Sequence, residues 1–165
     1  MSKFLLSVLF ISLVAASCNK KPDKLTNPKI DKLKLLPGFE AEHLYSPGEN
    51  EQGSWVAMTF DNQGRMITSD QYGAIYRLVL PAQGDTSKLK VEKLIIGSKA
   101  DRNADTTTLK VGMGFAQGLL YAFNSLYVMV NHNSDKNFDK NTGLYRLQDT
   151  DGDDQFDKVT LLKSF

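Results

Sequence analysis

The sequence is poor in the residues that build disulfide and metal centres. Its 165 residues include one cysteine and two histidines, His43 and His132. A single cysteine excludes an internal disulfide framework, a zinc site built from thiolates and a CxxCH haem attachment site within this chain. Two isolated histidines do not make a metal site either.

An excess of charge of one sign is also absent. The 20 Lys and Arg residues stand against 19 Asp and Glu residues, which gives a formal net charge of +1. Without a basic field the chain has no electrostatic footprint for nucleic acid, so that class of partner is excluded. The hydrophobic content of 41% and the charged content of 24% are ordinary for globular proteins and exclude a disordered or collagen-like chain.

A hydrophobic run long enough to span a membrane is missing at the N-terminus. Residues 4–14 are nearly all apolar, but a transmembrane helix needs about 20 residues. Lys3 before the run and small residues after it form the pattern of a signal peptide. The exit, Ala15-Ala16-Ser17-Cys18, resembles a bacterial lipobox, in which the cysteine is acylated and becomes the N-terminus.

We therefore expect residues 1–17 to be a lipoprotein signal peptide, Cys18 to be lipidated and residues 18–35 to be a polar tether. Such a protein is exported and lipid-anchored to a bacterial membrane, in the periplasm or at the outer membrane or cell surface. The alternative is an ordinary secretory signal in which the cysteine occurs by chance.

Short alternating segments separated by turn residues follow residue 36. This pattern, without helical periodicity, predicts an all-β sandwich, barrel or propeller. The expected strands are 40–45, 53–60, 65–69, 74–80, 91–96, 118–123, 126–131, 143–148 and 159–165.

The second half of this region repeats the first. Ile75-Tyr76-Arg77-Leu78 returns 69 positions later as Leu144-Tyr145-Arg146-Leu147, and segment 65–69 returns about 61 positions later as 126–130. Two units of about four strands predict β-propeller blades, whereas a two-sheet sandwich that repeats by chance is the alternative. Two blades cannot close a ring, so we expect residues 36–165 to be the N-terminal, truncated part of a six-bladed propeller.

Six strings of this region carry a family resemblance: Gly53–Val56, Asp61–Arg65, Ser69–Gly73, Gln117–Phe123, Gly143–Arg146 and Asp149–Asp153. They resemble secreted bacterial proteins described as membrane-bound dehydrogenase-like or haem-binding. Their propeller is similar to that of PQQ-dependent glucose/sorbosone dehydrogenases. The resemblance implies a quinone-dependent oxidoreductase acting on sugars or alcohols, and a C-terminal cytochrome c domain or partner outside this stretch. It implies no haem here, and no catalytic base or quinone contact is matched.

The acidic segment 149–157 is the strongest candidate site. Oxygen-bearing residues at alternate positions have the spacing of a calcium loop, in which the seventh position ligates through its carbonyl. The expected ligands are Asp149, Asp151, Asp153, Gln155 and Asp157. The sixth position, Asp154, would then adopt a left-handed conformation, which Asp tolerates. The alternative is a solvated acidic hairpin.

Weaker candidates lie elsewhere. His132, in a loop after a strand, is a weak candidate for a catalytic base, and a surface histidine is the simpler interpretation. Asp70-Gln71-Tyr72 either lines a cavity or forms a turn with its own side-chain hydrogen bonds.

Most aromatic residues are expected in the core, although an exposed Trp55 would stack on sugar. If the chain is not catalytic, it is a cell-surface propeller that binds glycan or protein. The aromatic residues concerned are Trp55, Phe60, Tyr76, Tyr121, Phe123, Tyr127 and Tyr145.

Overall fold

The computed structural model describes residues 30–72, 74–82, 85, 89–97, 113, 115–131 and 142–165. The expected signal peptide, Cys18, most of the expected tether and His132 lie outside these ranges. The chain divides into two compact units, Met1–His43 and Leu44–Phe165. In the first, the described part contains two turns, closed by hydrogen bonds from Leu33 N to Ile30 O and from Phe39 N to Leu36 O.

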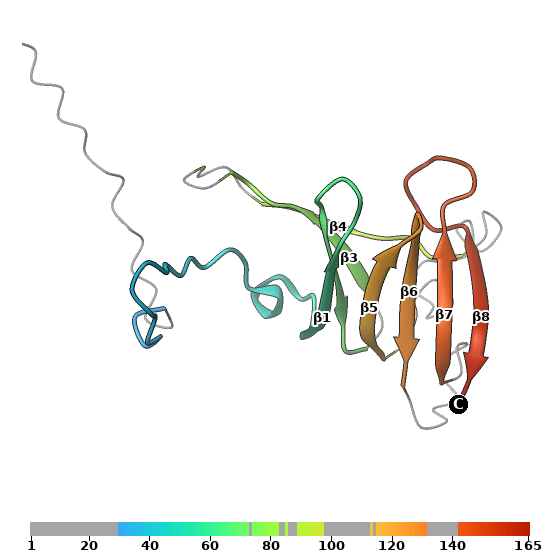
Figure 1. Ribbon diagram of the computed structural model, residues 1–165, viewed down its shortest axis with the longest axis horizontal. Coiled ribbons are helices and arrows are strands. Elements are labelled where there is room, and N and C mark those ends of the chain that lie inside the picture. The colour runs from blue at the N-terminus through green and yellow to red at the C-terminus, as the bar shows by residue number, and fades with distance from the viewer. Residues whose placement is uncertain are drawn as a thin grey trace, which may run out of the picture. The chain divides into compact units, whose positions relative to one another are not determined.

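The second unit is built from two antiparallel four-stranded sheets (Figure 1). The only helical segment among its described residues is one 3-10 turn, η1 (Pro47–Asn50). Sheet 1 contains β1 (Trp55–Phe60), β2 (Met66–Asp70), β3 (Ile75–Val79) and β4 (Lys90–Lys93). Sheet 2 contains β5 (Ala116–Ala122), β6 (Ser125–Val130), β7 (Gly143–Gln148) and β8 (Lys158–Ser164). In each sheet the strands lie side by side in chain order, and the expected all-β class is confirmed.

The two sheets repeat one another in register. β1 and β5 each begin with an irregularity, at Trp55/Ala57 and at Ala116/Gly118. In β3, Leu78 pairs with Met66, and in β7 Leu147 makes the same pairing with Leu126. The strands carrying the repeated tetrapeptides therefore occupy equivalent positions, as the sequence predicts.

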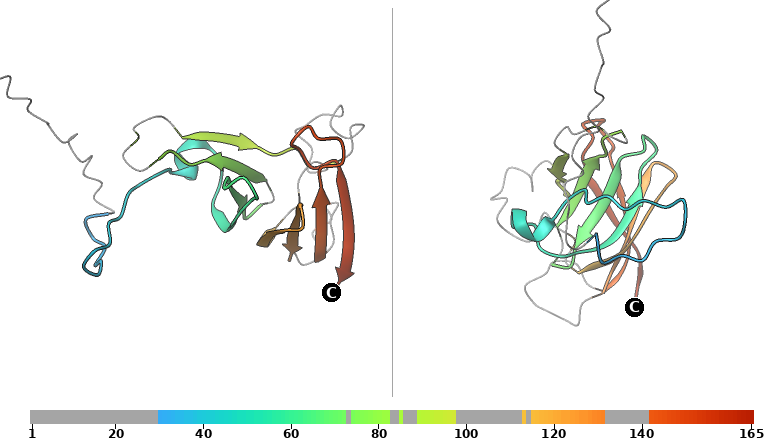
Figure 2. Two further views of the ribbon diagram at one scale, coloured as in Figure 1. Left: turned by 45° about the horizontal axis from the view of Figure 1, so that its top comes forward. Right: turned by 90° about the vertical axis from the view of Figure 1, so that its left-hand side faces the viewer.

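The core lies between the sheets. β1 and β2 of sheet 1 lie against β5 of sheet 2, and Figure 2 shows the two sheets from two further directions. The hydroxyl of Ser69, which is fully buried, donates to the carbonyl of Ala116 at 2.7 Å, and Tyr121 N donates to Thr59 Oγ1 at 3.3 Å. The buried apolar side chains of this core come from both sheets and their loops: Ile67, Ile75, Leu94, Ile96, Met113, Ala116, Leu126, Val128, Val130, Tyr145, Leu147 and Phe156.

Three sequence predictions about elements differ from the structure. Residues 40–45 form no strand, because no strand in the described part of the chain pairs with this largely exposed segment. The strand expected at 91–96 is β4, which ends at Lys93, and Ile96 instead makes a single parallel bridge to Phe156. The expected strands 118–123 and 126–131 leave Asn124 and Ser125 between them as the turn, whereas the turn lies one residue earlier, at Phe123-Asn124.

That turn explains one aromatic residue. Phe123 and Asn124 have φ values of 51° and 49°, the left-handed pair typical of a type I′ hairpin turn. The turn directs Phe123 into solvent, with 87% of its surface exposed, so its expected place in the core is wrong. Phe60 is exposed as well, whereas Tyr76 and Tyr145 are buried as predicted.

Trp55 has aromatic neighbours on both sides. Tyr45 stacks on it with ring centroids 5.2 Å apart, and Tyr76 lies tilted at 5.7 Å. Half-buried between these rings, Trp55 is a packing residue and not the exposed platform that stacking on sugar requires. Among the residues that the structure describes, no helix has the length and apolar character needed to cross a membrane.

Candidate metal loop at the joint between the sheets

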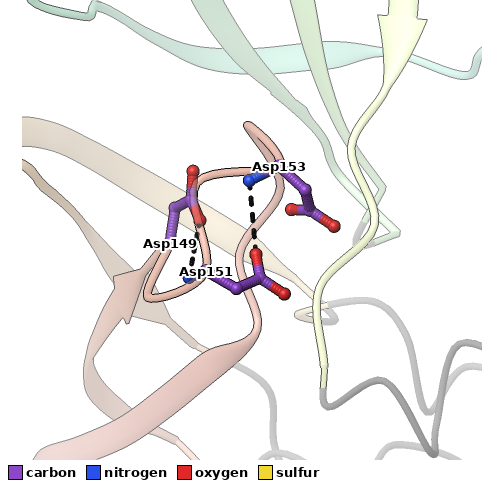
Figure 3. A group of neighbouring side chains, drawn as sticks. All are labelled: Asp149, Asp151 and Asp153. Carbon is purple, nitrogen blue, oxygen red and sulfur yellow. Dashed lines mark hydrogen bonds between the residues drawn. The ribbon is translucent and has the colours of Figure 1, made fainter.

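The loop between β7 and β8 brings three of the expected ligands together. Asp149, Asp151 and Asp153 each offer a carboxylate oxygen, and these three oxygens lie within 4.8 Å of one another (Figure 3). All three side chains are exposed. Their alternation along the loop places them on one side, as the spacing predicts.

Backbone N–H groups inside the loop hold these carboxylates. Asp149 accepts from Gly152 N at 2.7 Å and from Asp154 N at 2.9 Å. Asp151 accepts from Asp153 N at 3.3 Å, and Asp153 accepts from Gln155 N at 3.0 Å. The left-handed residues Gly152 and Asp154, at φ 78° and 67°, bend the chain so that each N–H points back at the preceding acid. The left-handed conformation expected for Asp154 is confirmed.

The other two expected ligands have different partners. The side-chain amide of Gln155 accepts from Ile95 N at 2.8 Å and donates to Glu92 at 2.6 Å, so only its backbone carbonyl could face an ion. Asp157 accepts from both the backbone N–H and the hydroxyl of Thr150. These two bonds lower the pKa of the Asp157 carboxyl, the one from the hydroxyl most strongly.

Asp154 connects the loop to sheet 1. Its carboxylate forms a two-pronged ion pair with Arg65, with N–O distances of 2.5 and 2.8 Å. Arg77 Nη1 lies 2.9 Å from the same carboxylate and donates to the Asp154 carbonyl at 2.9 Å. The pKa of Asp154 is lowered, chiefly by the hydrogen bond from Arg65 and further by the charge of Arg77, against an opposing effect of burial.

Each arginine also pairs with a second acid, which lies in the β1–β2 connection for Arg65 and in β4 for Arg77. Arg65 Nε pairs with Asp61 at 2.6 Å, and Arg77 pairs with Glu92 at 2.7 Å. The ion pairs and hydrogen bonds to Asp154 and Asp61 raise the pKa of Arg65 above its ordinary value. Because Arg77 is buried, with only 7% of its side chain exposed, these acids offset the cost of taking its charge out of water.

Sequence reasoning missed this network. Arg65 and Asp154 lie 89 positions apart, so no local spacing reveals the pair. The one available signal is an arginine, Arg77, in the middle of an otherwise apolar strand, where it needs an acid from outside that strand.

The remaining sequence candidate is a turn. Asp70 accepts from Ser54 N at 3.1 Å and from Tyr72 N at 3.2 Å, and its own N–H donates to Ala74 O at 2.8 Å. These bonds close the β2–β3 connection, so Asp70 acts as a turn residue.

Comparison of the chain with family models, with curated proteins and with solved structures gives no match.

Proposed function

We propose that the β7–β8 loop binds Ca²⁺ and that the bound ion rigidifies the joint between two consecutive blades of a β-propeller. The supporting observation is that different residues of the loop have different partners. Asp149, Asp151 and Asp153 converge on one another, while Asp154 and Gln155 are held by sheet 1. An ion at the three acids would therefore fix the segment that holds the sheets together.

The chemistry of the donors fits a hard cation. Ca²⁺ takes six to eight oxygen ligands, from carboxylates, carbonyls and water. The three carboxylates and the Gln155 carbonyl would supply part of this set, and water would complete it. The nearby arginines, Arg65 and Arg77, pair with Asp154, Asp61 and Glu92.

The test is calcium-dependent stability of the full chain after treatment with a chelator. A dissociation constant of about 10 μM would give about 2.7 kcal/mol of stabilisation at 1 mM Ca²⁺. We expect Asp151→Asn/Asp153→Asn to abolish this gain. Glu49→Gln/Glu51→Gln, a matched loss of two acids in η1 and directly after it, should retain it. Equal calcium stabilisation in the Asp151/Asp153 variant and the unmodified chain would show that the ion does not bind at this loop.

We propose further that the propeller is exported and lipid-anchored through Cys18, and that it serves a quinone-dependent oxidoreductase of sugars or alcohols. Support comes from the lipobox-like exit and the family resemblance of the sequence strings, together with the repeated four-stranded sheets. A bound quinone would accept two electrons from the substrate alcohol. None of the described residues is assigned a contact with it.

Two measurements test this second proposal. Palmitate labelling of the protein in a bacterial host should disappear in Cys18→Ser. Added pyrroloquinoline quinone with Ca²⁺ should support sugar-dependent reduction of an artificial electron acceptor. Binding to a glycan array without any such reduction would instead identify a non-catalytic cell-surface propeller.

A further inference from the structure

The face of sheet 1 that sheet 2 covers has an exact counterpart on sheet 2. We call the covered face the receiving face; it comprises Thr59, Ile67, Ser69, Ile75 and Arg77. Strand pairing places Thr59, Ile67 and Arg77 in one cross-strand row and Ser69 with Ile75 in another. The counterpart on sheet 2, which we call the outer face, has the rows Leu120-Tyr127-Arg146 and Met129-Leu144.

The two faces differ in what covers them. On the receiving face Ile67, Ser69, Ile75 and Arg77 are all at least 94% buried. On the outer face Leu120 is 58% exposed. The other outer-face residues are half-buried: Tyr127, Met129, Leu144 and Arg146. These side chains lie on the opposite side of sheet 2 from its core residues, among them Val128, Tyr145 and Leu147. Sheet 2 thus presents a largely apolar face that would be buried at the equivalent place in sheet 1.

The equivalent arginines show what a partner must supply. Arg77 pairs within its own sheet with Glu92 and across the joint with Asp154. Arg146 donates from Nε to Ser125 Oγ at 3.0 Å, and among the described residues no carboxylate lies within salt-bridge distance of it. The position equivalent to Glu92 is Thr160, which pairs with Arg146 in the sheet but carries no charge. Covering Arg146 therefore requires an acid from the partner, because a buried unpaired guanidinium is strongly destabilising.

We propose that the outer face of sheet 2 docks a third four-stranded antiparallel sheet of the same repeat, whose loop between its third and fourth strands supplies a carboxylate to Arg146. This inference rests on the proposed propeller architecture. The existing joint supplies the template: the same rows on sheet 1 accept sheet 2, and the same arginine position receives its loop acid.

The test appends a second copy of residues 98–165 after Phe165, so that the added sheet presents to sheet 2 the face that sheet 2 presents to sheet 1. In a Cys18→Ser background, Met129→Cys places a thiol on the outer face, at the position equivalent to Ser69. We expect maleimide to modify this thiol at least tenfold more slowly in the tandem protein than in the single chain. Met58→Cys reports on the opposite face of sheet 1, where Met58 is 62% exposed, and should react equally in both.

Charge exchange tests whether a carboxylate of the added sheet pairs with Arg146. In the tandem protein, Arg146→Glu in the first copy should restore fast labelling at position 129. Asp154→Arg in the appended copy should then slow the labelling again. A variant with Leu120→Thr, Tyr127→Ile and Leu144→Ile gives sheet 2 the receiving face of sheet 1 and shows whether the appended copy folds and docks.

Two results would overturn the proposal. The first is that the thiol is protected in none of the tandem proteins, or only in the variant that carries Leu120→Thr, Tyr127→Ile and Leu144→Ile. The other is slow labelling already in the single chain, with sedimentation showing self-association, which would identify a second copy as the occupant. The labelling needs no quinone and is measured both with Ca²⁺ and with a chelator, so a thiol that stays unprotected under both conditions is distinguishable from failure of the proposed metal loop or redox activity.

Discussion

Replacement of Asp154 by Asn is the most direct test of how the two sheets are joined. The substitution removes the charge that Arg65 and Arg77 share and preserves a side chain that tolerates the left-handed conformation at φ 67°. Each arginine retains one acid, Asp61 or Glu92, so neither becomes an unpaired buried charge.

The expected loss of unfolding free energy is limited because each arginine keeps one acidic partner. Hydrogen bonds to charged groups contribute about 1.5–3 kcal/mol each, whereas exposed ion pairs contribute about 0–1 kcal/mol. The Asp154 side chain is 48% exposed and Arg77 is 7% exposed, which places this pairing between the two cases. We expect Asp154→Asn to cost about 2 kcal/mol of unfolding free energy, or about 8 °C in Tm for a unit of this size. Asp154→Ala should cost about 1–2 kcal/mol more, because alanine tolerates the left-handed conformation poorly.

The same pairing predicts a dependence on pH. The pKa of Asp154 is lowered in the folded protein, so its stabilising contribution is fully present above the unfolded-state pKa of about 3.9 and is lost as the pH falls through the lowered folded value. The Tm difference between the unmodified chain and Asp154→Asn should stay constant from pH 7 to about pH 5 and shrink below about pH 4. Thermal unfolding followed by circular dichroism measures both effects, with Glu49→Gln as an exposed acidic control.

A change of less than about 1 °C at pH 7 would refute the assigned role of Asp154, because the predicted loss is several times larger. A Tm difference that persists unchanged to pH 2.5 would show that the charge of Asp154 is not its source.

Three further predictions follow from the geometry, each measured by denaturant unfolding. Gly53→Ala should cost more than about 2 kcal/mol, because the added Cβ would lie 2.1 Å from a carboxylate oxygen of Asp70. Gly64→Ala, at a similar φ but with open space around the added Cβ, should cost only about 1 kcal/mol. Equal costs for the two variants would contradict the clash at Gly53. Phe123→Gly should stabilise the protein by about 0.5–1 kcal/mol, since glycine accepts φ 51° and the lost side chain is almost wholly exposed; a loss of stability would show that Phe123 packs. Ser69→Ala should cost about 1–2 kcal/mol, because it removes the hydroxyl that donates to the buried carbonyl of Ala116; unchanged stability would show that this hydrogen bond does not hold the joint.

Local patterns were sufficient to predict most strands. The tetrapeptide shared by 75–78 and 144–147 alternates with a period of two, and both copies occupy the third strand of a sheet. Segment 40–45 alternates as well, but a strand exists only where another strand pairs with it, and its neighbours in sequence do not determine that. Phe123 was misplaced for a similar reason, because the two-residue turn that exposes it depends on the register of β5 against β6.

The sequence predicts only the part of the site that depends on contacts within the β7–β8 loop. Alternate acids predicted the convergence of Asp149, Asp151 and Asp153, since that arrangement depends on the loop alone. The partners of Gln155 and Asp154 come from sheet 1, more than 50 positions earlier in the chain, and no spacing within the loop encodes them.

The positions of the two kinds of acid explain why one loop can serve both as a joint and as a metal site. Asp154 and Gln155 are adjacent and are held by groups of sheet 1, whereas Asp149, Asp151 and Asp153 are held by N–H groups of the loop itself. Asp149 accepts from the N–H of Asp154, so the acid cluster and the contact with sheet 1 share the residue Asp154. A cation that draws Asp149 inward would act directly on the residue that pairs with Arg65 and Arg77. The calcium gain should therefore be smaller in Asp154→Asn than in the unmodified chain, although Asp154 is not itself an expected ligand. An undiminished gain would mean that the loop binds the ion independently of the joint.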